Sequence, residues 1–115
     1  MNIQIFGTKK SSDARKAERW FKERRVKFQY IDLLDKGISK GELRNVAQVC
    51  GGLDALIDPA AQDQDALARA RYAAPAQKED VLLENPQILR QPIVRDGKKA
   101  AVGYAPEVYE AWMKE

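Results

Sequence analysis

The residues best placed for chemistry stand near the amino terminus, where hydroxyls and a carboxylate follow two lysines: Lys9, Lys10, Ser11, Ser12 and Asp13. Serine and aspartate side chains are typical helix N-caps, so a helix is predicted to begin here. Free backbone amides at that helix end, beside two ammonium groups, favour a small anion. A serine hydroxyl is a weak nucleophile near neutral pH unless a general base activates it. The segment therefore offers no activated nucleophile. A small anion could bind at this turn, but the Asp13 carboxylate weakens such binding.

The residue types that are missing limit the chemistry further. The chain of 115 residues has no histidine and a single cysteine, Cys50. A zinc site or a histidine relay is hard to build without histidine, and one thiol cannot form an internal disulfide. We therefore expect no metal. Cys50 lies on the apolar side of a predicted helix without a cationic neighbour, which favours a buried structural thiol over a reactive one.

Charge is unevenly distributed along the chain. The first 50 residues carry 12 Lys and Arg against 6 Asp and Glu, whereas the rest carry 8 against 11. Seven of the positive residues form what we call the basic face, which is the best candidate surface for a partner, with an ordinary solvated helix face as the alternative. No helix-turn-helix or aromatic stacking motif accompanies it, so direct nucleic-acid binding is not expected. The basic face comprises Arg15, Lys16, Arg19, Lys22, Arg24, Arg25 and Lys27.

Length and hydropathy predict one compact domain that buries its own core. No apolar run approaches the roughly 18 residues of a membrane helix, and the first residues lack the pattern of a secretory signal. We therefore expect a soluble, cytoplasmic protein.

The elements that would position the turn follow from periodicity. Residues 2–6 and 26–31 alternate between polar and apolar, which predicts two strands. Between them, residues 12–25 repeat apolar side chains at helical spacing, with Trp20 as a packing residue. A strand, helix and strand in this order predict a right-handed βαβ unit with parallel strands.

The remainder predicts a helical insertion over about 38–89, in which the helix 41–50 ends at two glycines and three or four short helices follow. Residues 91–103 have the pattern of a hairpin, because Asp96-Gly97 favours a tight primed turn. A last helix begins near Pro106 and is predicted to bury Val108, Ala111 and Trp112. The order β-α-β, helices, β-β, α predicts an α/β, thioredoxin-like fold with a small mixed sheet.

Two segments carry a resemblance to a known family. Phe6-Gly7-Thr8-Lys9-Lys10-Ser11, followed by Arg15–Phe21, resembles the start of the ArsC-type arsenate reductases and their relatives, including the redox regulator Spx. Leu89–Val94 and Val102-Gly103-Tyr104 are similar to that family's R-P-I strand and V-G-Y close. The resemblance covers essentially the whole chain, residues 1–115 as one domain. It also implies that Pro92 takes the cis form.

The resemblance implies catalytic residues that this chain does not have. In ArsC enzymes a cysteine in the first loop attacks arsenate, and that position is Ser11; the second cysteine of Spx-type members is Ala14. The arginine expected in the insertion falls at Ala60, and the arginine before the proline is Gln91. Arg90, one residue earlier, is predicted to point the other way on an extended segment. Serine has no accessible anionic form near neutral pH, and the loss of two guanidinium groups weakens the binding of an oxyanion.

The first hypothesis is therefore an ArsC/Spx-related protein that has lost arsenate or thiol reductase activity and acts as a non-catalytic binding or regulatory protein, with a protein or small anion as partner. A second is an Spx-like transcriptional regulator contacting RNA polymerase. A third is a glutathione-dependent oxidoreductase with an atypical site around Ser11; only then would a cofactor, glutathione, be involved. A cis Pro92 either leaves neighbouring backbone groups free to bind an extended ligand, or it is a structural turn with no role in binding. The predicted binding residues are Lys9, Lys10, Ser11, Ser12, Gln91 and Pro92.

Overall fold

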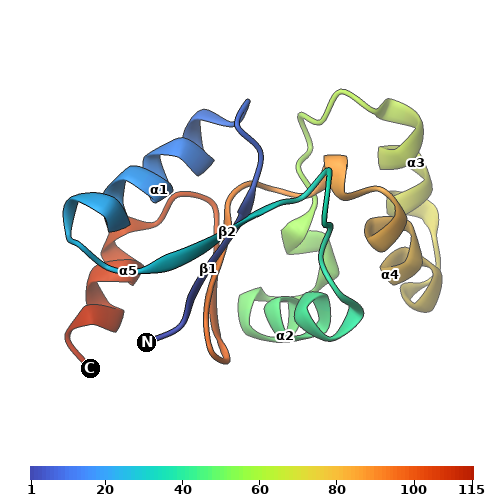
Figure 1. Ribbon diagram of the computed structural model, residues 1–115. Helices are drawn as coiled ribbons and strands as arrows, with labels where there is room; N and C mark the ends of the chain where they lie inside the picture. Colours follow the sequence, from blue (N-terminus) through green and yellow to red (C-terminus); the bar gives the residue numbers. More distant parts are fainter.

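A computed structural model describes all 115 residues and contains one four-stranded sheet (Figure 1). The strands lie in the order β2-β1-β3-β4, with β1 and β2 parallel and the other two pairs antiparallel. This arrangement confirms the predicted thioredoxin-like topology. The strands are β1 (Ile3–Gly7), β2 (Phe28–Asp32), β3 (Ile93–Asp96) and β4 (Lys99–Val102).

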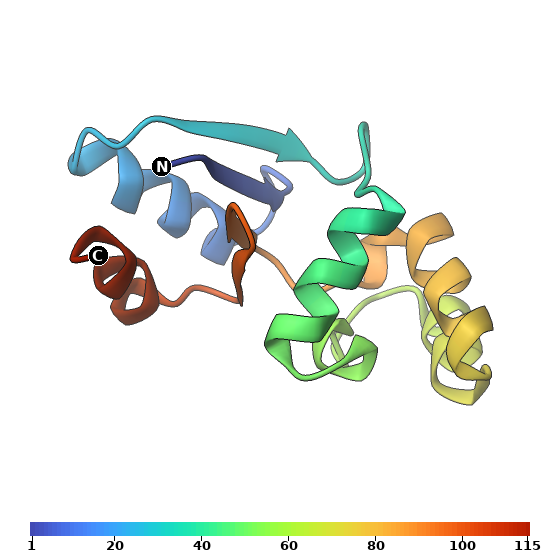
Figure 2. The ribbon, with the colours of Figure 1, turned by 90° about the horizontal axis from the view of Figure 1, so that it is seen from below.

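Helices cover the two faces of the sheet unequally. Helix α1 (Ser12–Glu23) and the final helix α5 (Pro106–Met113) lie on one face, and the helical insertion lies on the other (Figures 1 and 2). The insertion consists of α2 (Lys40–Cys50), the 3₁₀ turn η1 (Leu53–Leu56), α3 (Gln64–Tyr72), α4 (Pro75–Glu84) and the 3₁₀ turn η2 (Pro86–Ile88).

The sheet separates two hydrophobic cores because successive strand residues point to opposite faces. Ile3 and Ile5 pack with Phe21 and Tyr109 on the face of α1 and α5. Phe6, next along β1, packs instead into the larger core of the insertion. The first core is rich in aromatic rings, with the Trp20 and Phe21 centroids 4.9 Å apart in an edge-to-face arrangement.

The helices of the insertion begin and end as their sequences favour. Ser39 and Glu42 form a complete capping box at the start of α2, and Gly51 closes that helix with a φ of 101°. A two-point ion pair joins α2 to α4, because Arg44 Nε and Nη2 donate to the Glu79 carboxylate at 2.8 and 3.1 Å. These contacts hold the insertion together as a packed unit.

A polar network joins the insertion to the sheet. Arg95 on β3 donates to the Gln4 side chain at 2.6 Å and to the Asn45 side chain at 3.0 Å. Asn45, on α2, in turn donates to the Lys98 carbonyl at the hairpin turn, at 3.0 Å. The Arg95 side chain is only 15% exposed, so the contacts within this network are shielded from water. The network therefore helps set the position of α2 relative to β1 and β3.

Some element limits and core residues differ from the sequence predictions. Helix α1 ends at Glu23, because Arg25 takes a left-handed φ of 57° and turns the chain, and β2 then begins only at Phe28. In α5 the buried residues are Tyr109 and Trp112, whereas Ala111 is exposed. Trp112 and the partly buried Val108 pack into the core as predicted, so the predicted stripe was wrong only at Ala111, because the larger Tyr109 ring fills the aromatic core. None of the helices combines the length and the apolar character needed to span a membrane.

Candidate functional site

The loop between β1 and α1 is held in place by its own backbone and by Ser11. The Ser11 amide donates to the Thr8 carbonyl at 3.1 Å, and the Ser11 hydroxyl accepts from the Ala14 amide at 3.1 Å. Ser11 is thus the N-cap of α1, with an extended φ and ψ of −80° and 118°. The Ser11 hydroxyl oxygen accepts a hydrogen bond from the first turn of α1, and no basic side chain lies within hydrogen-bond distance of this hydroxyl.

Gly7 allows α1 to start very close to the end of β1. A methyl group placed on Gly7 would lie 2.7 Å from the Ala14 Cβ and 3.2 Å from the Tyr30 hydroxyl oxygen. Ala14 itself is fully buried. The position that carries the second cysteine in Spx-type proteins is therefore filled by a methyl group packed against the glycine backbone.

Gln91 connects this loop to the segment before β3. Its side-chain oxygen accepts from the Thr8 amide at 2.7 Å and from the Thr8 hydroxyl at 3.0 Å. Thr8 is the one buried polar residue of the chain, at 8% exposure. Both Thr8 donors would otherwise be left without a partner, so the Gln91 carboxamide satisfies buried groups rather than reaching toward a ligand.

The bond between Gln91 and Pro92 is cis, as the resemblance implies. The Pro92 carbonyl accepts from the Gly103 amide at 2.8 Å, and the Tyr109 hydroxyl donates to the Gly103 carbonyl at 3.1 Å. The backbone amide and carbonyl of Gln91 take part in no backbone hydrogen bond. The backbone groups of Gln91 are therefore available for hydrogen bonding, whereas the Pro92 carbonyl is already bonded within the protein.

A small cavity of about 180 Å³ lies beside Gln91. We call it the loop cavity; Asp13, Asp58, Arg90, Gln91, Val102 and Gly103 line it. One guanidinium group thus faces two carboxylates. Such a balance does not favour an oxyanion, because each carboxylate repels the negative charge that the guanidinium would attract.

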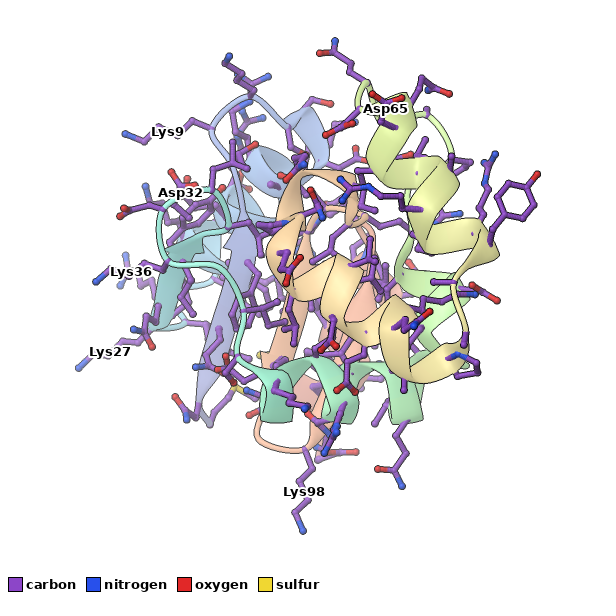
Figure 3. The ribbon with its side chains drawn as sticks, turned by 90° about the vertical axis from the view of Figure 1, so that its right-hand side faces the viewer. Lys9, Lys27, Asp32, Lys36, Asp65 and Lys98 are labelled. Carbon is purple, nitrogen blue, oxygen red and sulfur yellow. The ribbon has the colours of Figure 1, made fainter.

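The predicted binding residues separate into two groups. Gln91, Pro92 and Ser11 all lie near the start of α1, but only Gln91 lines the loop cavity. Lys9, Lys10 and Ser12 are exposed, and the Lys9 side chain projects away from the body of the protein (Figure 3). The two lysines therefore do not converge with the helix amides on one enclosed anion site.

Sequence reasoning missed the three charged residues of the loop cavity. The position of Asp13 predicts a helix cap, and Asp58 lies in the insertion, far away along the chain. Arg90 was predicted to point away from the position of Gln91, yet it lines the same cavity. The segment before Pro92 is not a regular strand, since its only ladder contact is the bridge of Leu89 with Ile57, so simple alternation does not apply there.

Two further groups have shifted acidity. Burial raises the pKa of the Cys50 thiol, so it holds even less thiolate near neutral pH than a free cysteine. Burial, Glu18 and Asp32 raise the pKa of Tyr30, whose hydroxyl is buried without a hydrogen-bond partner. No group of three or more acidic, cysteine or histidine side chains is arranged to hold a metal ion.

Comparison with known proteins places these features in a family. The model of the ArsC family matches residues 6–112, and the chain belongs to this family. The chain is 27% identical over 113 residues to the global transcriptional regulator Spx 2 of Lactococcus lactis subsp. lactis (strain IL1403), covering 96% of this chain and 86% of that protein. It is 29% identical over 106 residues to Spx 2 of Oceanobacillus iheyensis, covering 90% and 78%.

Solved structures show the same fold. The arsenate reductase from Vibrio cholerae superposes with a TM-score of 0.82 at 21% identity, covering 96% of this chain and 97% of that one. Ser11, which the sequence resemblance places at the family's cysteine position, caps α1. Gln91, which the resemblance places at the arginine before the cis proline, is bonded to Thr8. Ala60, which the resemblance places at the other arginine position, is exposed in the loop after η1.

Replacing Gln91 tests its structural role. In Gln91→Met the two Thr8 donors lose their acceptor inside the protein, so we expect the free energy of unfolding to fall by about 1–3 kcal/mol. Denaturant unfolding measures this, with Arg90→Met as the matched control, because Arg90 is exposed and its only hydrogen bond is from its backbone amide to the Leu56 carbonyl, which the substitution keeps. Equal losses in the two variants would contradict this role.

Proposed function

We propose that this chain is a non-catalytic member of the ArsC family that acts in the cytoplasm by binding a protein partner or a small anion. One observation carries the proposal: Ser11, which the resemblance places at the reactive cysteine position, uses its oxygen to cap α1. A cysteine at a helix N-terminus is activated because the helix dipole stabilises its thiolate. The same dipole cannot produce a useful concentration of alkoxide from serine, which needs a general base.

The surroundings of Ser11 support this proposal. Arsenate would need cationic groups to neutralise it, and the loop cavity offers Arg90 alone, against Asp13 and Asp58. Cys50 does not replace the missing thiol, because it lies at the end of α2 on the other side of the sheet and burial raises its pKa. Neither the attack on arsenic nor the capture of the oxyanion has its usual residues.

A second candidate is an Spx-like regulator that contacts RNA polymerase. The two Spx 2 relatives are global transcriptional regulators and align over nearly the whole chain. The basic face is available for such a partner, since all seven of its residues are exposed. Within it, Lys16 pairs weakly with Asp13 at 3.7 Å, and the Arg24 guanidinium lies 3.9 Å from the Trp20 ring centre. The other five form no ion pair in the structure.

An arsenate turnover assay tests the loss of catalysis. With glutathione and glutaredoxin as reductants, we expect the wild type and Ser11→Ala to reduce arsenate at the same background rate, because neither presents a nucleophile. A thiol-dependent arsenate reductase run in parallel serves as the positive control. Turnover in the wild type that Ser11→Ala abolishes would overturn the proposal and favour the glutathione-dependent enzyme.

A binding experiment tests the regulatory candidate. If the basic face contacts RNA polymerase, the double variant Arg15→Glu, Arg19→Glu should lose co-purification with the enzyme, because two attractive charges become repulsive. The control variant Lys36→Glu, Lys98→Glu reverses two exposed charges elsewhere, on side chains that point into solvent (Figure 3), and should retain binding. Absence of binding by the wild type, or equal loss in both variants, would count against this candidate.

A further inference from the structure

A second and larger cavity lies within the helical insertion. Its volume is about 320 Å³, and we call it the insertion pocket. It is formed where η1, the end of α3 and the start of α4 meet the segment before Pro92; Figure 3 shows α3 and α4 from the outside. Asp54, Ile57, Pro59, Arg71, Lys78 and Arg90 line it.

The charges around the insertion pocket are strongly unbalanced. Three basic side chains face a single carboxylate. That carboxylate, Asp54, is held by the Lys78 ammonium at 2.6 Å. Arg71 and Arg90 form no ion pair and no hydrogen bond through their side chains. Two guanidinium groups therefore border the same cavity, and neither is engaged in an ion pair with the protein.

The ion pair with Asp54 holds the Lys78 side chain in place at the edge of the pocket. The Lys78 side chain is only 14% exposed, although lysine is rarely buried without a reason, whereas that of Asp54 is 78% exposed. Lys78 also lies in the first turn of α4, where the helix dipole disfavours a positive charge. Because Asp54 balances the charge of Lys78, the net positive charge of the pocket comes from Arg71 and Arg90, and Lys78 contributes ordered N–H donors beside them.

The size and lining of the pocket define the ligand. A volume near 300 Å³ is at the lower end for small-molecule sites, so it suits a compact metabolite. Guanidinium groups bind phosphate and carboxylate oxygens through paired, charge-assisted hydrogen bonds. Only Ile57 and Pro59 add an apolar surface to the lining, so recognition must be mainly electrostatic.

We propose that the insertion pocket binds a small phosphate monoester, whose phosphate group is held by Arg71, Arg90 and Lys78. The loop cavity does not compete for such a ligand, because its two carboxylates outnumber its one guanidinium. Arg90 lines both cavities, so a phosphate in the insertion pocket draws this side chain away from the start of α1. This site is independent of the proposed loss of catalysis.

Titration followed by backbone amide NMR tests the site with glycerol 3-phosphate and inorganic phosphate, at about 0.15 M sodium chloride so that diffuse attraction is screened. We expect saturable shifts at Ile57, Arg71, Lys78 and Arg90, and none with glycerol. Arg71→Ala should weaken binding about tenfold, because one charge-assisted contact is lost. Arg71 is exposed, so this variant is expected to fold, which its amide spectrum verifies.

Arg69→Ala is the matched control, since Arg69 is exposed on the same turn of α3 but does not line the pocket. It should bind like the wild type. Equal weakening in both variants, shifts that centre on residues 9–13, or shifts that do not saturate would overturn the proposal. Arsenate turnover or polymerase binding does not enter this test, so its failure is separate from failure of the proposed function.

Discussion

The structure of the candidate site depends on one paired contact, in which the Gln91 side-chain oxygen accepts from both the amide and the hydroxyl of Thr8. These residues are 83 positions apart, and they bring together the two segments that carry the family's chemistry. An arginine at position 91 has no acceptor and would leave both Thr8 donors unpaired. Glutamine at this position therefore stabilises the loop by accepting from both Thr8 donors.

The sheet and the elements packed on its two faces hold the Gln91–Thr8 contact in position. The aromatic core under α1 and α5 sets the start of α1, and the Arg95 network sets α2 against the opposite face. Because both sides are anchored, Arg90 lies between two cavities of different charge. One is dominated by carboxylates and the other by basic groups. The basic side chains near Arg90 therefore line the insertion pocket and not the loop cavity.

Much of the fold could be predicted from the sequence because the signals are local. Alternation in β1, the caps of α1 and the glycines after Cys50 each concern only a few neighbouring residues. The Asp96-Gly97 turn is similar: Gly97 takes a φ of 60°, as a primed turn requires. Features that depend on contacts between residues far apart in the chain were harder to predict from the sequence. Asp58 and Arg90 meet Asp13 only through tertiary packing, and the choice of Tyr109 over Ala111 depends on the aromatic core. The cis Pro92 followed from the family resemblance and not from its own dipeptide.

The central claim is that the amino-terminal turn forms no covalent bond with a substrate. Intact-protein and peptide mass spectrometry during incubation with arsenate, glutathione and a mixed-disulfide donor measures this directly. We expect no added mass on the peptide that contains residues 8–13, even after rapid acid quenching. An arsenic, glutathione or acyl adduct on Ser11 that forms and decays during turnover would contradict it.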